Sequence, residues 1–177
     1  MASIEYPWYE IVESGSPLSQ GDFFDLCPVV VPRAEIGGEG SQVVAEVIKY
    51  DVVVMSQSCD LENQNLEIVL VCPIWPLSEF QDTNDFYRSK NGKESLRKGN
   101  QPGYHLINEC DLEGFEQEFR VVDFRNVYGI PYDMLVEISK ERERRVRLLP
   151  PYREHLSQAF ARFFMRVGLP TDIPRFD

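Results

Sequence analysis

Apolar residues fall along this chain in short runs, a pattern that predicts β-strands over much of its length. β-Branched and other apolar side chains dominate three runs, Val43–Ile48, Asp51–Met55 and Leu66–Ile74. Near-continuous apolar runs of this length are typical of strands that are buried on both faces, as in a small barrel. The run Phe23–Val31 is similar but contains Pro28, which favours an edge strand or a strand that ends in a turn.

The second half of the chain alternates strand patterns with polar segments. Tyr104–Ile107 and Phe119–Phe124 predict two further strands, because both are rich in aromatic and β-branched residues. The segment 79–103 is polar and contains glycines, so we expect a surface insertion with one or two helical turns. A glycine and a proline punctuate Asn126–Met134, which predicts a loop.

The C-terminal segment has the periodicity of a helix. Apolar side chains recur there at helical spacing, at Leu156, Ala159, Phe160, Phe163 and Val167. This spacing predicts an amphipathic helix over Tyr152–Val167. Pro150 and Pro151 mark its start, Gly168 is the expected C-terminal cap, and Arg166 suits the dipole of the last turn.

Length and composition favour one globular domain. The chain has 177 residues, of which 43% are hydrophobic and 12% aromatic, enough for a single core. Within one domain, 1–177, we expect an N-terminal arm at 1–20 that packs on the domain, a barrel at 21–135 with the insertion at 79–103, and a helical segment at 136–177. No apolar run approaches the roughly 18 residues of a membrane-spanning helix, and the first residues carry acids, so we expect a cytoplasmic protein without membrane contact.

Charge is unevenly distributed along the chain. Eighteen basic against 29 acidic residues give a net charge of −11, which argues against a protein whose whole surface grips nucleic acid. Residues 140–166, however, hold eight basic residues against three acidic ones. The run Lys140–Arg147 makes RNA a candidate partner through a local basic face, although its interleaved acids favour a solvated face with internal ion pairs.

Three stretches, in this order along the chain, resemble the MazF/PemK toxin family. They are Gly21–Val30; Val52–Gln57 together with Leu66–Pro73; and Gly114-Phe115 followed by Phe119–Asn126 and Leu135. The resemblance implies a mainly-β fold: a small SH3-like barrel with a C-terminal α-helix, here with an insertion at 79–103. It also implies the scaffold of a metal-independent endoribonuclease, without a cofactor, in a family whose members commonly form homodimers.

The catalytic residues of that family are not matched in this chain. Its members use an Arg just before the Val-rich strand, usually followed by Pro, and a Thr or Ser at the end of the next strand. Tyr50-Asp51 and Pro73 occupy these places here. Cleavage of RNA by its own 2′-oxygen needs a base, together with a cation or donor at the phosphorane oxygens, and these substitutes cannot supply them.

Because the chain resembles this family but lacks its catalytic Arg and Thr or Ser, our first functional hypothesis is a binding role. We expect a non-catalytic or catalytically altered binding module, with a protein or nucleic-acid partner, in a toxin–antitoxin or phage-defence type of system. An active endoribonuclease with relocated groups is the competing hypothesis. His105 would then act as the base, Arg125 would donate to the phosphate, and Gln57 or Ser58 would orient the substrate. The structural alternatives are a hydrogen-bonded histidine and an arginine paired with a carboxylate.

The segment after the Val-rich strand is the candidate binding site. It comprises Ser56, Gln57, Ser58, Cys59 and Asp60. A position at a barrel rim would suit a binding groove, but these residue types also form ordinary turns.

Cysteine chemistry gives a third hypothesis, a thiol or metal site. A nucleophilic Cys59 would need His105 or His155 as its base. Cys27, Cys59, His105 and Cys110 are of the types that bind zinc, but no two of them have a diagnostic spacing, so we predict no metal. The four cysteines are expected to be free thiols.

Overall fold

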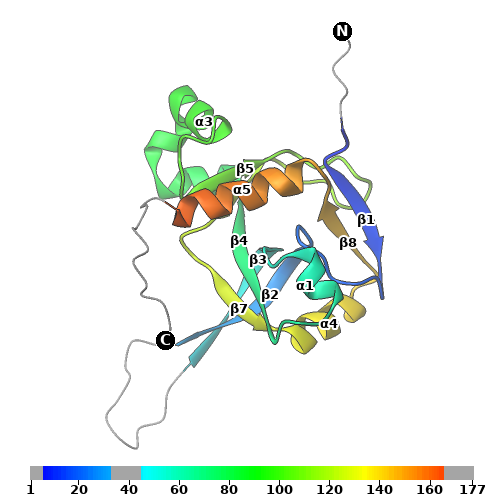
Figure 1. Ribbon diagram of the computed structural model, residues 1–177. Helices are drawn as coiled ribbons and strands as arrows, with labels where there is room; N and C mark the ends of the chain where they lie inside the picture. The colour runs from blue at the N-terminus through cyan, green and yellow to red at the C-terminus, as the bar shows by residue number, and fades with distance from the viewer. Residues whose placement is uncertain (1–5, 33–44, 166–177) are drawn as a thin grey trace, which may run out of the picture.

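A computed structural model describes residues 6–32 and 45–165 (Figure 1). Its strands are β1 Tyr9–Glu13, β2 Phe23–Pro32, β3 Ala45–Val54, β4 Ile68–Pro76, β5 Tyr104–Ile107, β6 Arg120–Asp123, β7 Tyr128–Pro131 and β8 Arg144–Leu148. Its helices are α1 Ser58–Glu62, α2 Leu77–Phe80, α3 Lys90–Arg97, α4 Tyr132–Glu141 and α5 Tyr152–Phe164, with short 3₁₀ helices η1 Gln81–Thr83 and η2 Asp85–Arg88. The predicted mainly-β class with a C-terminal helix is confirmed.

The larger sheet is antiparallel and is organised around β4. Its strand order is β2-β3-β4-β6-β5, and β7 also pairs with β4. Val71 of β4 lies opposite Val54 of β3 on one side and Tyr128 of β7 on the other. The last residues of β4 then pair with β6, where Trp75 lies opposite Val121. Among the described strands, this pairing follows an open path rather than a closed ring.

A second, two-stranded sheet joins the two ends of the described chain. In it β1 pairs with β8, with Tyr9 opposite Leu148. The segment expected as an N-terminal arm therefore contains a strand. The two sheets meet at Gly21 and Asp22: the Leu148 N–H donates to the Gly21 carbonyl at 2.9 Å, and Asp22 forms a bridge with Arg147. Gly21 has a φ of +85°, and a Cβ there would lie 3.1 Å from the Leu148 Cβ, so this junction favours glycine.

The valines at the end of β3 are buried on both faces of the sheet, as their continuous run predicts. Val52, Val53 and Val54 are all fully buried. Val53 belongs to the hydrophobic cluster that α5 covers through Leu156. Val52 and Val54 point to the other face and belong to a cluster with members from α1 and α4. The other predicted runs are not buried throughout, since Val47, Ile68 and Leu70 are 62%, 48% and 41% exposed.

The predicted boundaries within this sheet need correction. Two separate strands were expected at Val43–Ile48 and Asp51–Met55, but the residues from Ala45 to Val54 form one strand; positions 43 and 44 lie outside the described residues. For β2 the edge-strand alternative is confirmed: β2 is the first strand of the sheet and continues through Pro28, which lies opposite Lys49. An edge strand tolerates proline because one of its sides makes no ladder hydrogen bonds.

The prediction of a loop at Asn126–Met134 is wrong, because this segment contains β7 and the start of α4. Gly129 lies opposite Leu70 of β4, and a Cβ there would lie 2.7 Å from the Ile68 Cγ2. Glycine thus permits a close approach of two strands here rather than a turn. Pro131 is the last residue of β7, where a missing N–H is tolerated.

The basic run Lys140–Arg147 is only partly the solvated face that was expected. It is divided between the end of α4 and the start of β8. Lys140 is exposed and pairs with Glu137 within α4. Arg145, by contrast, is buried and pairs with Asp22 at 2.9 Å, far away in the sequence. The pattern of interleaved charges did not distinguish these two environments.

The final helix begins where its sequence pattern predicts. α5 starts at Tyr152, buries Leu156, and packs Ala159, Phe160 and Phe163 against the core. It ends at Phe164, short of the expected Val167; the expected cap at Gly168 and the dipole contact of Arg166 lie outside the described residues. No helix in the described ranges is both long enough and apolar enough to cross a membrane.

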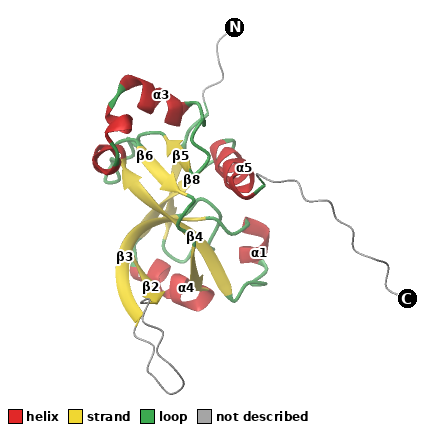
Figure 2. Cartoon of the chain, turned by 90° about the vertical axis from the view of Figure 1, so that its left-hand side faces the viewer, coloured by secondary structure: helices red, strands yellow, loops and turns green. Residues whose placement is uncertain are grey.

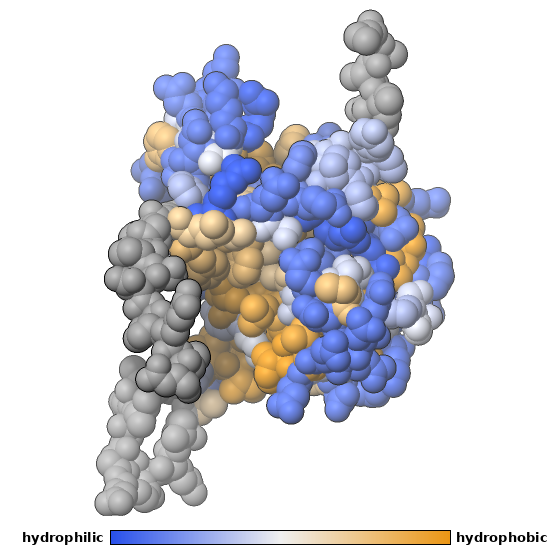
Figure 3. Space-filling view, viewed as in Figure 1, coloured by the Kyte–Doolittle hydropathy of each residue, from blue (hydrophilic) through white to orange (hydrophobic). Residues whose placement is uncertain are grey.

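The insertion carries more helix than expected and lies near α5. It contains α3 and the short helices that precede it, packed around Phe80, Tyr87 and Leu96. Figures 1 and 2 both show α3 and α4 at opposite ends of the molecule. In Figure 3 apolar residues gather beneath α5, whereas the insertion above it is mainly polar. The side of α5 that faces α3 is therefore more polar than the face beneath α5.

Candidate functional site

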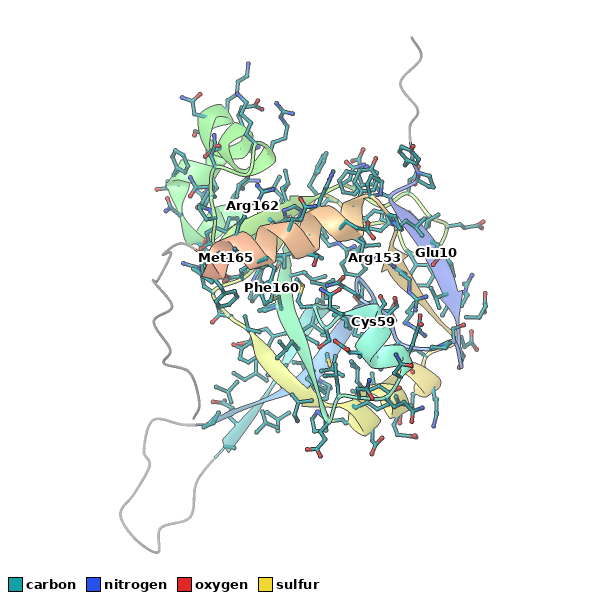
Figure 4. All side chains as sticks on the ribbon, viewed as in Figure 1. Glu10, Cys59, Arg153, Phe160, Arg162 and Met165 are labelled. Atoms are coloured by element: carbon teal, nitrogen blue, oxygen red, sulfur yellow. The ribbon has the colours of Figure 1, made fainter. Side chains whose placement is uncertain are left out.

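The segment 56–60 is largely occupied in holding the fold together. The Ser56 hydroxyl accepts from the Leu70 N–H at 2.8 Å, and the Ser58 and Ser19 hydroxyls lie 2.7 Å apart. The Gln57 amide donates to the Ser157 hydroxyl of α5 at 3.3 Å. Cys59 and Asp60 lie in α1, and Figure 4 shows Cys59 below α5.

Arg125 is held by its neighbours in the sequence and the fold. Its Nε and Nη2 donate to the two carboxylate oxygens of Asp123, at 3.1 and 3.3 Å. Its Cζ lies 4.4 Å from the centre of the Tyr104 ring. Because neighbouring residues of a strand point to opposite faces, Tyr104 directs Arg125 away from the face of His105. The structure thus brings Arg125 together with a carboxylate rather than with His105.

His105 instead shares a cavity with the second histidine of the chain. His105 lies on β5 with its ring stacked 6.2 Å from that of Phe124, and His155 lies on α5. Both line a cavity of about 590 Å³ between α3, β5 and α5, which we call the two-histidine cavity. Arg162 lines it from α5, and Figure 4 shows Arg162 on the edge of this helix that faces α3.

The two-histidine cavity is positively charged, in contrast to the acidic chain as a whole. Arg97 and Lys98 line it from the end of α3, and both pair with Glu94, at 2.5 and 3.4 Å. The hydrogen bond from Arg97 is the main reason why the pKa of Glu94 falls to about 2, so this carboxylate is ionised at neutral pH. The single negative charge of Glu94 is therefore shared by Arg97 and Lys98, which leaves a net positive charge. Arg162 has no ion pair within the described ranges.

The environment keeps His105 uncharged at neutral pH. Burial, followed by the nearby charges of His155 and Arg162, lowers the pKa of His105 from 6.5 to about 4. All three causes disfavour the imidazolium form. An anion in the cavity would offset the two charge effects, so the site is arranged to favour a negatively charged ligand.

The geometry suits binding of a phosphate better than proton abstraction. A cavity of about 590 Å³ has the size of a small-molecule site and can hold a nucleotide unit. Arg162 can donate two parallel hydrogen bonds to a phosphate. A general base works best when its pKa lies near the working pH, and the pKa of about 4 makes His105 a weak base.

The cysteines offer little chemistry in the described structure. All four are free thiols, as expected. Burial raises the pKa of Cys27 to about 11 and that of Cys72 to about 12, and it also raises the pKa of Cys110. These three thiols are therefore protonated and poor nucleophiles. Within residues 6–32 and 45–165, no group of three or more His, Cys, Asp or Glu side chains could hold a metal ion.

Sequence reasoning identified His105 but not the group around it. His155, Gln158 and Arg162 lie at helical spacing on the polar side of α5, a pattern visible in the sequence. Nothing in the sequence showed that the end of α3 would lie opposite this side. Comparison with protein-family models gives no match for the chain, and comparison with curated proteins gives none either.

Proposed function

We propose that this protein is a binding module that holds a phosphate of single-stranded RNA in the two-histidine cavity without cleaving the RNA. The observation that carries the proposal is the meeting of both histidines with Arg162, a guanidinium without an ion pair in the described ranges. Because the chain as a whole has a net charge of −11, only the cavity, and not the protein as a whole, attracts the phosphate. Recognition then depends on a ligand that can enter the cavity.

Single-stranded RNA fits this site better than a duplex. A flexible strand can turn one phosphate into a cavity, whereas the phosphates of a duplex lie on a broad rigid surface that an acidic protein would repel. The Gln158 amide lines the same cavity and can donate or accept hydrogen bonds at a base or a 2′-hydroxyl.

The proposal includes a relationship to the MazF/PemK toxins, with an SH3-like barrel and a role in a toxin–antitoxin or phage-defence type of system. The order of β2, β3, β4 and a C-terminal helix supports the fold; the system rests on the resemblance alone. The place of the family's catalytic Arg carries no cation. Tyr50 stacks on Tyr128 with ring centres 5.6 Å apart, and the Asp51 carboxylate accepts from the Leu26 N–H at 2.7 Å.

RNA cleavage is the second candidate function, and one observation favours it. Two imidazoles in one cavity are the groups that a metal-independent nuclease needs for acid–base catalysis. His105 would be the base and His155 the acid. The low pKa of His105 makes this the weaker candidate.

The test is the binding of a short, fluorescently labelled, unstructured RNA, measured by anisotropy in buffer with EDTA. We expect Arg162→Gln to weaken binding about tenfold, because it removes a charge-assisted hydrogen bond. Lys140→Gln is the matched control, since Lys140 is exposed and pairs with Glu137 on α4 at the other end of the molecule. Equal loss in both variants, or none in Arg162→Gln, would contradict the proposed site.

The same samples, run on a denaturing gel, distinguish the two candidate functions. Intact RNA supports a binding module. Cleavage that is lost in both His105→Gln and His155→Gln would instead establish the nuclease.

A further inference from the structure

A second, smaller cavity has four arginines among its lining residues. Arg120 of β6, Arg144 and Arg145 of β8, and Arg142 just before β8 surround a space of about 60 Å³, which we call the arginine cavity. It shares no lining residue with the two-histidine cavity. Its residues do not enter the proposed function.

Two of these arginines are buried and have donors without an acceptor. Arg120 is 5% exposed, and its Nε and Nη2 have no hydrogen-bond partner. Arg145 is 3% exposed; it donates to Asp22 and to two backbone carbonyls, but its Nη1 has no partner. Buried charged donors are costly to leave unsatisfied, and native structures satisfy nearly all of them. Arg120 and Arg145 both line the arginine cavity, so an acceptor bound there would lie beside side chains that keep donors without a partner.

The nearby carboxylates are already engaged. Asp22 pairs with Arg145 and also with Arg147, whose Nε lies 2.5 Å from its Oδ1. Asp25 lies at the cavity, with its Oδ2 3.9 Å from Arg142 Nη1. Asp22 thus pairs with Arg145 and Arg147, and Asp25 with Arg142. Neither carboxylate forms an ion pair with Arg120 or Arg144, although the charge of Arg120 also acts on Asp25.

Arg120 and Arg144 have no ion pair within the described ranges. Their guanidinium groups lie over aromatic rings instead, with Cζ 4.4 Å from the centre of the Phe23 ring and 5.5 Å from that of Phe115. These rings hold the cations in place without neutralising them. Two positive charges therefore remain at the cavity, one buried and one at its exposed edge.

We propose that the arginine cavity binds a single phosphate group. A phosphate has only acceptors, and its double negative charge balances Arg120 and Arg144. A space of about 60 Å³ is that of about two liquid water molecules, which suits a phosphate group but not a nucleoside. The group can be inorganic phosphate or the phosphate end of a monoester, because Arg144 lies at the exposed edge.

The test is the thermal unfolding of the full chain in inorganic phosphate, compared with chloride at equal ionic strength. We expect phosphate to raise Tm by about 5 °C at saturation. Arg144→Gln should lose most of this rise. Arg120→Met should lose at least as much of it and should also raise Tm without phosphate, because it removes a buried charge without an ion pair. Arg88→Gln, an exposed arginine paired with Asp82, should keep the full rise.

Arg162→Gln separates this inference from the proposed function, since it should lose RNA binding but keep stabilisation by phosphate. A rise with inorganic phosphate or with adenosine monophosphate supports the site and identifies which source it accepts. An equal rise in chloride or acetate would overturn it, as would a rise that persists in Arg144→Gln or disappears in Arg162→Gln. If Arg120→Met does not fold, the exposed Arg144 decides the outcome.

Discussion

Asp22 lies where the two sheets meet, and its carboxylate connects them. The side chain is fully buried and accepts hydrogen bonds from Arg145 Nε at 2.9 Å and from Arg147. It also accepts from the Ser19 N–H at 3.0 Å. Removing one partner of a buried ion pair leaves an uncompensated charge, which costs far more than the loss of an exposed pair.

We therefore expect Asp22→Asn to lower the free energy of unfolding by about 3–5 kcal/mol, measured by urea denaturation. Asp82→Asn is the control, because Asp82 pairs with Arg88 at 2.7 Å but is 73% exposed. Its cost should be below about 1 kcal/mol. Similar values for the two variants would contradict the connecting role of Asp22.

His105 makes stability depend on pH in a defined direction. Its pKa is about 4 in the folded chain and 6.5 as a free side chain, so between these pH values the unfolded chain binds a proton that the folded chain does not. Stability contributed by neutral His105 is therefore present above pH 6.5 and is lost as pH falls toward 4. The charged groups at this cavity are His155 and Arg162 on α5, and Arg97 and Lys98 with their partner Glu94 on α3.

The comparison of wild type with His105→Gln isolates this effect from the carboxylates that titrate in both. As pH falls from 6.5 to 4, the unfolding free energy of the wild type should drop by up to about 3 kcal/mol more than that of the variant. Urea denaturation across this range measures the difference. Parallel pH curves would show that His105 is not held in its neutral form.

At the scale of elements, the apolar pattern of the sequence predicted those strands and helices whose apolar side chains are buried. The valine run of β3 and the helical spacing in α5 each identified an element, because Val52–Val54 and the apolar residues of α5 pack against the core. Gly129 led to the wrong prediction of a loop, because glycine is favoured both in a turn and where two strands lie close together. The partner of Arg145 was equally hidden, since Asp22 is 123 positions away. The two-histidine cavity could not be predicted for the same reason, since α5 is far in the sequence from α3 and β5, which line the cavity together with it.

The position of α3 depends on one glycine. The Ser89 hydroxyl accepts from the Gly92 N–H at 3.0 Å and caps the helix, and Gly92 packs against the chain at Phe86. A Cβ at residue 92 would lie 2.0 Å from the Phe86 carbonyl oxygen, which is backbone and cannot turn aside. A larger residue must therefore move α3, which carries Arg97 at its end and leads directly into Lys98.

Gly92→Ala should destabilise the insertion locally by about 1–3 kcal/mol and weaken RNA binding several-fold. Faster amide hydrogen exchange in α3 would report the local change, while the hydrogen exchange of β3 stays as in the wild type. Lys93→Ala, at an exposed position of the same helix, should alter neither property. Normal RNA binding by Gly92→Ala would show that α3 does not contribute to the site.

The whole molecule combines a strongly acidic chain with two cationic cavities. Its net charge is −11, yet Arg162 in one cavity and Arg120 and Arg144 in the other have no carboxylate partner in the described ranges. The acidic chain repels polyanions at long range, and the cavities attract single phosphates at short range. Such a distribution selects ligands that can present one phosphate at a time.

The salt dependence of RNA affinity tests this distribution. Each phosphate neutralised on a single strand contributes about −0.7 to the slope of log K against log salt, so a cavity that holds one phosphate gives a slope of about −0.7. A basic stripe using all eight basic residues of 140–166 would give a slope steeper than about −5. Arg162→Gln should make the slope shallower by about 0.7, whereas Lys140→Gln should leave it unchanged. A steep slope that depends on Lys140 would move the RNA from the two-histidine cavity to the basic run, because only a surface contact uses a lysine on α4.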